Sequence, residues 1–97
     1  VEVVQIDPVT NGGISASLRA LEMANQAGLR ASSHYTDELS AHLLCAASSP
    51  VYLEKHAFAL DRYLEAPQQV VNGRVRPTEA AGTGMRFSER TLARYRA

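Results

Sequence analysis

Apolar residues recur with two different periods along the first half of the chain. Residues 1–7 are rich in Val and Ile, whose β-branched side chains favour a strand. Residues 14–27 repeat apolar side chains at helical spacing, and Gly28 follows where a helix commonly ends. The alternation continues and predicts a strand at residues 29–34, a helix at 36–47 and a strand at 51–56.

Strands alternating with helices predict an α/β fold with a parallel sheet built from βαβ units. Three parallel strands and two helices do not close a sheet, because a parallel sheet needs both faces covered and a (β/α)-barrel needs roughly 250 residues. The chain also starts inside a predicted strand and without a methionine. We therefore expect these residues to be the C-terminal piece of a longer polypeptide.

Beyond residue 56 the alternation of strands and helices ends. Residues 57–67 mix polar and apolar side chains and finish at a proline. The pair Asn72-Gly73 predicts a hairpin, because it favours a two-residue turn between strands. A glycine-containing loop follows at residues 78–87, and residues 88–97 predict a short terminal helix that begins at a serine cap.

Charge and composition narrow the classes of partner. The 97 residues carry 10 basic and 10 acidic side chains, and this balance argues against nucleic acid as the default partner. The hydrophobic content of 45% is typical of one folded domain, and no apolar run is long enough to span a membrane, so we expect no membrane partner. The single cysteine, Cys45, cannot form an internal disulfide, which fits a reducing compartment and predicts a cytoplasmic location.

Three ionisable residues close the three predicted strands: Asp7, His34 and Glu54. Reactive residues of a parallel barrel cluster at the C-terminal ends of its strands. A carboxylate beside a histidine holds the imidazole in one tautomer, and the imidazole then acts as a general base or acid. A protonated carboxylic acid in a closed site can donate a hydrogen bond to a developing oxyanion. The set therefore suits proton abstraction next to a carbonyl or carboxylate.

Each of these residues also has a structural interpretation. Asp7 precedes a proline and is a common type of turn residue. His34 could be a hydrogen-bonded neighbour of the following helix. Glu54 could form an ion pair with Lys55 or Arg62 at the end of its strand. The residues alone leave these alternatives open.

The stretches QIDPVTNGGIS, GLRASSHYTDELSAHLLCAA, VYLEKH and NGRVRPTEAAGTGM resemble the C-terminal part of the enolase superfamily, specifically its mandelate racemase subgroup. The separations of 27 residues from Asp7 to His34 and of 20 from His34 to Glu54 fit the pattern of the subgroup. The resemblance implies the C-terminal portion of a (β/α)7β TIM-like barrel. Strands six to eight would lie within residues 1–66, and a tail, residues 67–97, would run toward an N-terminal capping domain.

The resemblance also implies roles for individual residues. Asp7 and His34 match the Asp-His dyad, in which the Asp orients the His and the His is the general base or acid. Glu54 matches the Glu that hydrogen-bonds the substrate as it becomes an enediolate. Tyr35 and His56 are candidate substrate-binding residues. Members of the family bind Mg²⁺ through carboxylates on the third to fifth strands, so we expect Mg²⁺ as the cofactor and assign no metal ligand in this chain.

The reaction implied by the resemblance is Mg-dependent abstraction of the α-proton of a small carboxylate substrate. We favour an acid-sugar (aldonate or aldarate) dehydratase, because the subgroup contains many of these enzymes. The alternative within the family is a racemase or epimerase of a 2-hydroxy acid, which requires a second base. A hypothesis from another class is a non-catalytic fragment or interaction module. We also expect a homo-oligomer.

Overall fold

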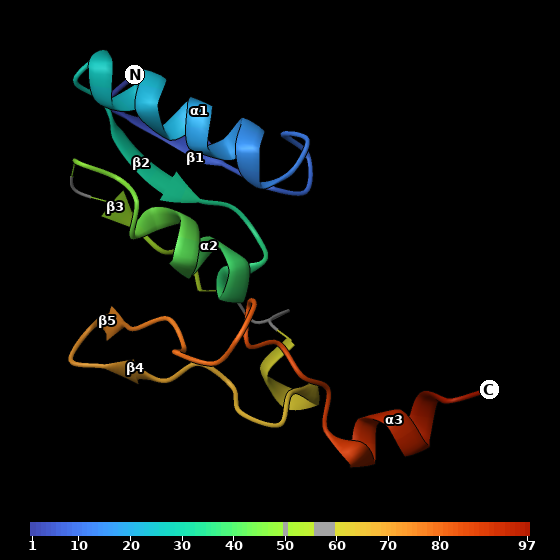
Figure 1. The fold of residues 1–97 in the computed structure, drawn as a ribbon. Coiled ribbons are helices and arrows are strands. Elements are labelled where there is room, and N and C mark those ends of the chain that lie inside the picture. The colour runs from blue at the N-terminus through green and yellow to red at the C-terminus, as the bar shows by residue number, and fades with distance from the viewer. Residues whose placement is uncertain (50, 56–59) are drawn as a thin grey trace.

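The computed structural model describes residues 1–49, 51–55 and 60–97 (Figure 1). Three strands, two helices and a 3-10 helix come first, followed by a hairpin and a terminal helix. In chain order the elements are β1 (Val3–Ile6), α1 (Ile14–Gln26), β2 (Arg30–Ser33), α2 (Asp37–Leu44), β3 (Val51–Tyr52), η1 (Leu60–Tyr63), β4 (Val70–Val71), β5 (Arg74–Val75) and α3 (Glu89–Tyr95).

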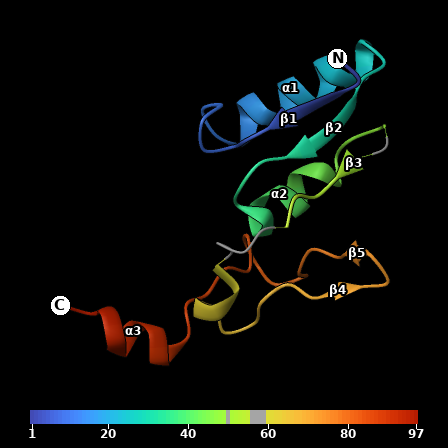
Figure 2. The same ribbon diagram turned by 180° about the vertical axis from the view of Figure 1, so that it is seen from behind.

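The first three strands form a parallel sheet in the order β1-β2-β3, which confirms the predicted βαβ arrangement. Ile6 of β1 pairs with Ser33 of β2, and Ser32 of β2 pairs with Tyr52 of β3. Figures 1 and 2 show α1 and α2 on the same face of this sheet. Because the three strands run parallel, their C-terminal ends lie at one common edge.

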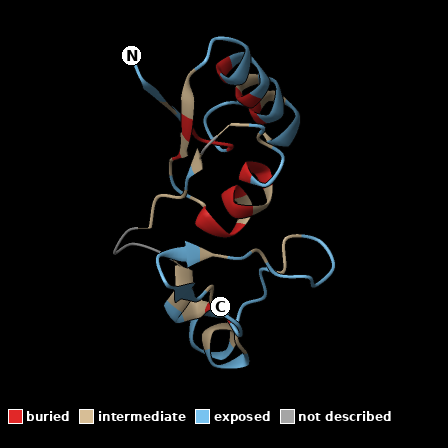
Figure 3. Ribbon diagram, turned by 90° about the vertical axis from the view of Figure 1, so that its left-hand side faces the viewer, coloured by how far each residue is buried: buried red, intermediate tan, exposed pale blue. Residues whose placement is uncertain are grey.

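The hydrophobic core lies between the sheet and the two helices. Leu21 of α1 and Leu43 and Leu44 of α2 pack against Ile6 and Ala31 from the strands. Figure 3 shows the buried positions gathered in this half of the molecule, with α2 the most buried element, while the hairpin and α3 are mostly exposed. The helical repeat of apolar residues therefore places α1 and α2 on the sheet as expected.

The ends of α1 and α2 follow local rules. Gly28 has φ of 69° after α1, and the Leu29 amide donates to the Ala24 carbonyl at 2.9 Å, as in a glycine-terminated helix. The predicted second helix, residues 36–47, is shorter in the structure and ends at Leu44. The Ala46 amide bonds to the Leu43 carbonyl at 3.0 Å, so the last turn tightens and the helix stops.

The third strand is also shorter than predicted. Residues 51–56 were expected to be extended, but β3 contains two residues. The amide of Glu54 donates to the Ser33 side-chain oxygen at 2.8 Å instead of a backbone carbonyl, so the ladder between β2 and β3 ends before Glu54. Residue 56, the end of the predicted strand, lies outside the described residues.

The second half of the chain begins with η1 and the predicted hairpin. Val70 pairs with Val75 across the Asn72-Gly73 turn, which confirms the hairpin. Leu64 forms an antiparallel bridge with Phe87, so the segment after η1 lies beside the end of the glycine loop. No helix among the described residues is long and apolar enough to cross a membrane.

The terminal helix α3 begins where the sequence predicts it. The Ser88 side-chain oxygen accepts a hydrogen bond from the Thr91 amide at 3.2 Å, which confirms Ser88 as the cap. The hydroxyl of Thr91 donates to the carbonyl of Tyr63 at 3.0 Å and ties α3 to η1. In Figure 1 this pair of elements lies at the opposite end of the molecule from β1 and α1.

Candidate active site

The strand-end group, Asp7, His34 and Glu54, lies along the common edge of the parallel sheet. Asp7 directly follows β1 and His34 directly follows β2. Since Ile6 and Ser33 are paired, the next residue of each strand falls beside the other, and the His34 amide continues the ladder to the Ile6 carbonyl at 3.0 Å. The side chains of Asp7 and His34 meet at 3.4 Å between Oδ2 and Nδ1.

Asp7 is buried and acts both as a turn residue and as the partner of the histidine. Its Oδ1 accepts a hydrogen bond from the Val9 amide at 2.8 Å, while Oδ2 faces His34. Burial alone would raise the pKa of Asp7, but hydrogen bonds from the Val9 amide, His34 and Thr10 outweigh it and hold the pKa below its ordinary value. Asp7 is therefore an anion at neutral pH.

His34 is half-buried, and its side chain is 40% exposed. An ionised Asp7 at Nδ1 favours the tautomer with the proton on Nδ1, which leaves a lone pair on Nε2. The ring of Tyr35 stands edge-on to the imidazole, with 4.4 Å between centroids and 86° between planes. The arrangement can present Nε2 as a base while the carboxylate and the tyrosine fix the ring.

Glu54 lies next to His34 on the far side from Asp7. Its Oε2 accepts a hydrogen bond from the Tyr35 amide at 3.1 Å, and its own amide is held by Ser33. The alternative of an ion pair with Lys55 finds no support, because the Lys55 ammonium contacts Asp37 instead. The three predicted residues are thus brought together in the order Asp7, His34, Glu54.

The two candidate substrate-binding residues have different outcomes. Tyr35 is 47% exposed and its ring lies against the imidazole of His34, so its substrate-binding role stays a prediction. His56 lies outside the described residues.

The sequence did not predict a partly buried group of charges that lies beside the strand-end group. The carboxylates of Asp37, Glu38 and Asp61 form an acidic cluster, and the ammonium of Lys55 lies 2.6 Å from Asp37 and 2.9 Å from Asp61. Burial alone would lower the pKa of Lys55, but hydrogen bonds with Asp37 and Asp61 outweigh it and hold the pKa above its ordinary value. The ammonium is therefore charged at neutral pH.

The acidic cluster has the donor set of a cation site. Its oxygen atoms lie within 4.8 Å of one another, a spacing that a metal ion could bridge. The Lys55 ammonium, however, already lies against two of the three carboxylates. Both carboxylate oxygens of Glu38 are buried without a hydrogen-bond partner among the described residues, and burial raises the pKa of this side chain. In the cluster one ammonium is therefore paired with the two carboxylates of Asp37 and Asp61, while burial favours the neutral form of the third carboxyl group, Glu38.

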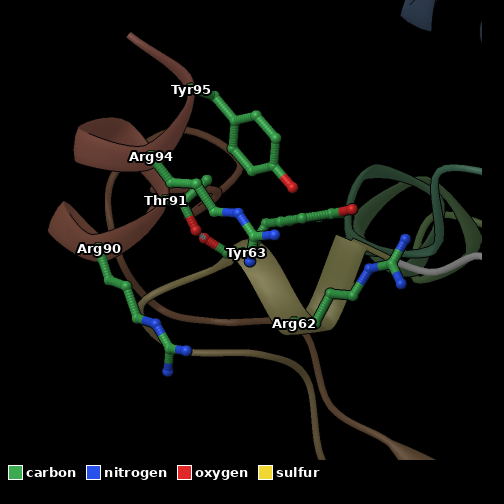
Figure 4. A pocket seen from close by; sticks show the side chains of 6 residues that line it. All are labelled: Arg62, Tyr63, Arg90, Thr91, Arg94 and Tyr95. Carbon is green, nitrogen blue, oxygen red and sulfur yellow. Dashed lines mark hydrogen bonds between the residues drawn. The ribbon is translucent and has the colours of Figure 1, made fainter.

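A separate hollow lies between η1 and α3, away from the strand ends (Figure 4). Arg62, Arg90 and Arg94 surround it, but Figure 4 shows the guanidinium groups of Arg62 and Arg90 pointing away from one another. Because these guanidinium groups do not converge, the hollow does not present a common site for an anion.

The chain is similar to one known protein family and to several solved structures. The sequence profile of the family described as enolase C-terminal domain-like matches residues 1–91. A Bradyrhizobium enolase solved with magnesium and mandelic acid is 30% identical with a TM-score of 0.87, over 97% of this chain and 26% of that chain. The L-talarate/galactarate dehydratase of Salmonella typhimurium LT2, solved with Mg and L-lyxarohydroxamate, is 26% identical with a TM-score of 0.85. The match covers 95% of this chain and 23% of that chain.

A third solved structure is also similar over nearly the whole of this chain. The L-talarate dehydratase of Polaromonas sp. JS666, solved with Mg and L-glucarate, is 25% identical with a TM-score of 0.77, over 96% of this chain and 25% of that chain. The chain spans about a quarter of the length of these solved relatives. Its fold matches the C-terminal part of the enolase-superfamily barrel domain, as the resemblance predicted, and the chain belongs to the enolase C-terminal domain-like family.

Proposed function

We propose that this chain supplies the general base and two supporting groups of an enzyme that removes the α-proton of a carboxylate substrate. The observation that carries the proposal is the 3.4 Å contact between Asp7 and His34, with the carboxyl group of Glu54 hydrogen-bonded to the amide of the next residue, Tyr35. The chain would be the C-terminal part of a longer polypeptide, in which strands outside this sequence complete the barrel.

The three residues divide the work of proton abstraction. Nε2 of His34 takes the α-proton, and the electron pair of the broken C–H bond moves into the substrate carboxylate to form an enediolate. Ionised Asp7 stabilises the imidazolium that results. One oxygen of Glu54 accepts a hydrogen bond from the Tyr35 amide. In its protonated form, Glu54 donates its O–H to the enediolate, and this hydrogen bond strengthens as charge develops.

The proposed cofactor is Mg²⁺, bound outside this chain. When bound, Mg²⁺ supplies Lewis-acid stabilisation to a carboxylate that gains charge. The described carboxylates fit it poorly, because Asp7 and Glu54 already accept hydrogen bonds and the acidic cluster holds the Lys55 ammonium. We therefore place the metal ligands in the part of the polypeptide outside these 97 residues.

Acid sugars are the proposed substrate class, with dehydration as the outcome. After α-proton removal the bond to a β-hydroxyl breaks, and the imidazolium of His34 returns its proton to the departing oxygen, so that water leaves. The two dehydratase relatives, solved with the ligands named above, support this choice. The relative solved with mandelic acid favours a second candidate, racemisation of a 2-hydroxy acid, in which the proton returns on the opposite face. A homo-oligomeric state and a cytoplasmic location stay predictions.

The test uses the complete polypeptide that carries this segment, with Mg²⁺ and a panel of aldarates, aldonates and 2-hydroxy acids in D₂O. We expect exchange or loss of the α-proton with at least one acid, and a keto product if water leaves. His34→Asn should abolish this reaction while Mg²⁺ binding persists. His42→Asn, which changes a histidine on the neighbouring helix α2, is the matched control and should retain activity. Unchanged α-proton exchange in His34→Asn would refute the assigned base.

A further inference from the structure

The backbone between His34 and α2 has an unusual conformation. Tyr35 and Thr36 are consecutive residues with φ of 50° and 41°, in the left-handed region. Neither is Gly or Asn, and a β-branched residue such as Thr is a clear outlier at positive φ. Two strained residues in a row persist only where surrounding contacts hold them, and such strain concentrates at functional sites. We call residues 34–37 the aiming turn, because its geometry sets the direction of the imidazole.

Three hydrogen bonds hold the first part of the aiming turn. The Tyr35 amide donates to the Glu54 carboxyl group at 3.1 Å, and the Tyr35 carbonyl accepts from the Ser40 hydroxyl at 3.1 Å. The Ser40 amide also donates to the Thr36 carbonyl at 2.8 Å. These hydrogen bonds fix the peptide groups around Tyr35. They do not include the side chain of Asp37, at the other end of the turn.

That far end is Asp37, whose side chain is 2% exposed and is paired with Lys55 at 2.6 Å. Lys55 directly follows Glu54 in the chain and also binds Asp61 at 2.9 Å. Two consecutive residues of the segment after β3 thus contact the aiming turn, Glu54 near its start and Lys55 at its end. A shift of Asp37 would rotate Thr36 and Tyr35 and move both His34 and the Glu54 carboxyl group that Tyr35 holds.

We propose that Lys55 is a positioning residue that locks the aiming turn through Asp37 and thereby sets the separation of His34 from Asp7 and Glu54. This inference rests on the proposed function for its catalytic meaning, although the structural coupling does not. Asp61 shares the ammonium and fixes its direction. We call this ion-paired group, Lys55 with Asp37 and Asp61, the clamp. It links the start of α2 to the segment after β3, beyond the point where the hydrogen bonds between β2 and β3 end.

The test compares Lys55→Met and Lys55→Arg in the complete polypeptide. Lys55→Met removes the charge at similar length, and we expect the kcat of α-proton exchange to fall by about tenfold to a hundredfold, as for a misplacement of about 1 Å. KM and Mg²⁺ binding should stay within about threefold, since the Lys55 ammonium is already paired with Asp37 and Asp61 and the proposal gives it no contact with the substrate. Lys55→Arg keeps the charge and should recover most of the rate. Arg30→Met, which breaks the exposed ion pair with Glu2, should leave the rate unchanged.

A second measurement separates the clamp from the proposed reaction. NMR signals of the His34 ring should shift in Lys55→Met relative to the wild type and should be nearly restored in Lys55→Arg, with Arg30→Met unchanged. If the ring signals of Lys55→Met match the wild type, the clamp is wrong whatever the activity. If they shift but the wild type exchanges no α-proton, the clamp stands and the proposed function is wrong. A kcat loss that only follows the unfolded fraction, with the ring signals of the folded fraction unchanged, would also overturn the clamp.

Discussion

The Lys55–Asp37 pair should contribute far more to stability than the surface ion pair of the same sheet. The two charged atoms lie 2.6 Å apart, and the side chains of Lys55 and Asp37 are 26% and 2% exposed. Coulomb attraction at this distance is about 6 kcal/mol at an effective dielectric constant of roughly 20, before the cost of desolvating both groups. Lys55→Met would leave the Asp37 carboxylate buried without its ammonium, and such a loss costs about 3–5 kcal/mol.

A double-mutant cycle measures this interaction. Lys55→Met, Asp37→Asn and the combined variant are unfolded in urea in the complete polypeptide, and we expect a coupling free energy of about 2–3 kcal/mol. The control cycle uses Arg30→Met and Glu2→Gln, whose side chains are 43% and 88% exposed and 3.2 Å apart. That pair should couple by about 0–1 kcal/mol, because water competes for both charges.

The pH dependence gives an independent check of the same pair. The pKa of Lys55 is raised above its ordinary value of 10.5, so its contribution is fully present below that pH and is lost as pH rises through the folded-state pKa. The coupling should therefore be the same at pH 7 and pH 9. A coupling as small as that of the control pair at pH 7 would refute the reasoning, because the buried ammonium would then contribute no more than an exposed one.

Two further changes test other parts of the structure. Burial raises the pKa of Glu38, so wild-type stability from this group is present at low pH and is lost as pH rises through the raised pKa. Glu38→Gln should therefore gain stability over the wild type from pH 4 to pH 8 in urea unfolding, and a gain independent of pH would contradict the burial argument. Gly84 and Gly73 both have φ of 70°, but an added Cβ at Gly84 would collide with the side chain of Thr78 and one at Gly73 meets nothing within 4 Å. Gly84→Ala should lower the melting temperature more than Gly73→Ala, whose cost is the strain of about 1–2 kcal/mol alone; equal losses would mean that Thr78 moves aside.

The geometry of the strand-end group follows from simple features of the sequence. Parallel strands with short crossovers end at one edge, so the residues after β1 and β2 had to lie close together once the strands were recognised. The pairing of Ile6 with Ser33 turns this expectation into the observed contact between Asp7 and His34. The hairpin and the cap of α3 were predictable for the same reason, since each depends on residues within a few positions of one another.

The clamp could not be predicted from the sequence, because a local preference already explains the acidic residue in it. Asp37 lies in the first turn of a helix, where the dipole alone favours an acidic residue, so nothing in the sequence calls for a distant partner. Its burial depends on how α2 packs against β2 and on the approach of Asp61 from η1, and Lys55 is 18 residues away. The left-handed φ of Tyr35 and Thr36 could likewise not be predicted, because Tyr and Thr favour other backbone conformations. Strain that local preference opposes must be maintained by tertiary contacts. We therefore expect Lys55, next to a predicted active-site residue, to couple the fold to the proposed chemistry.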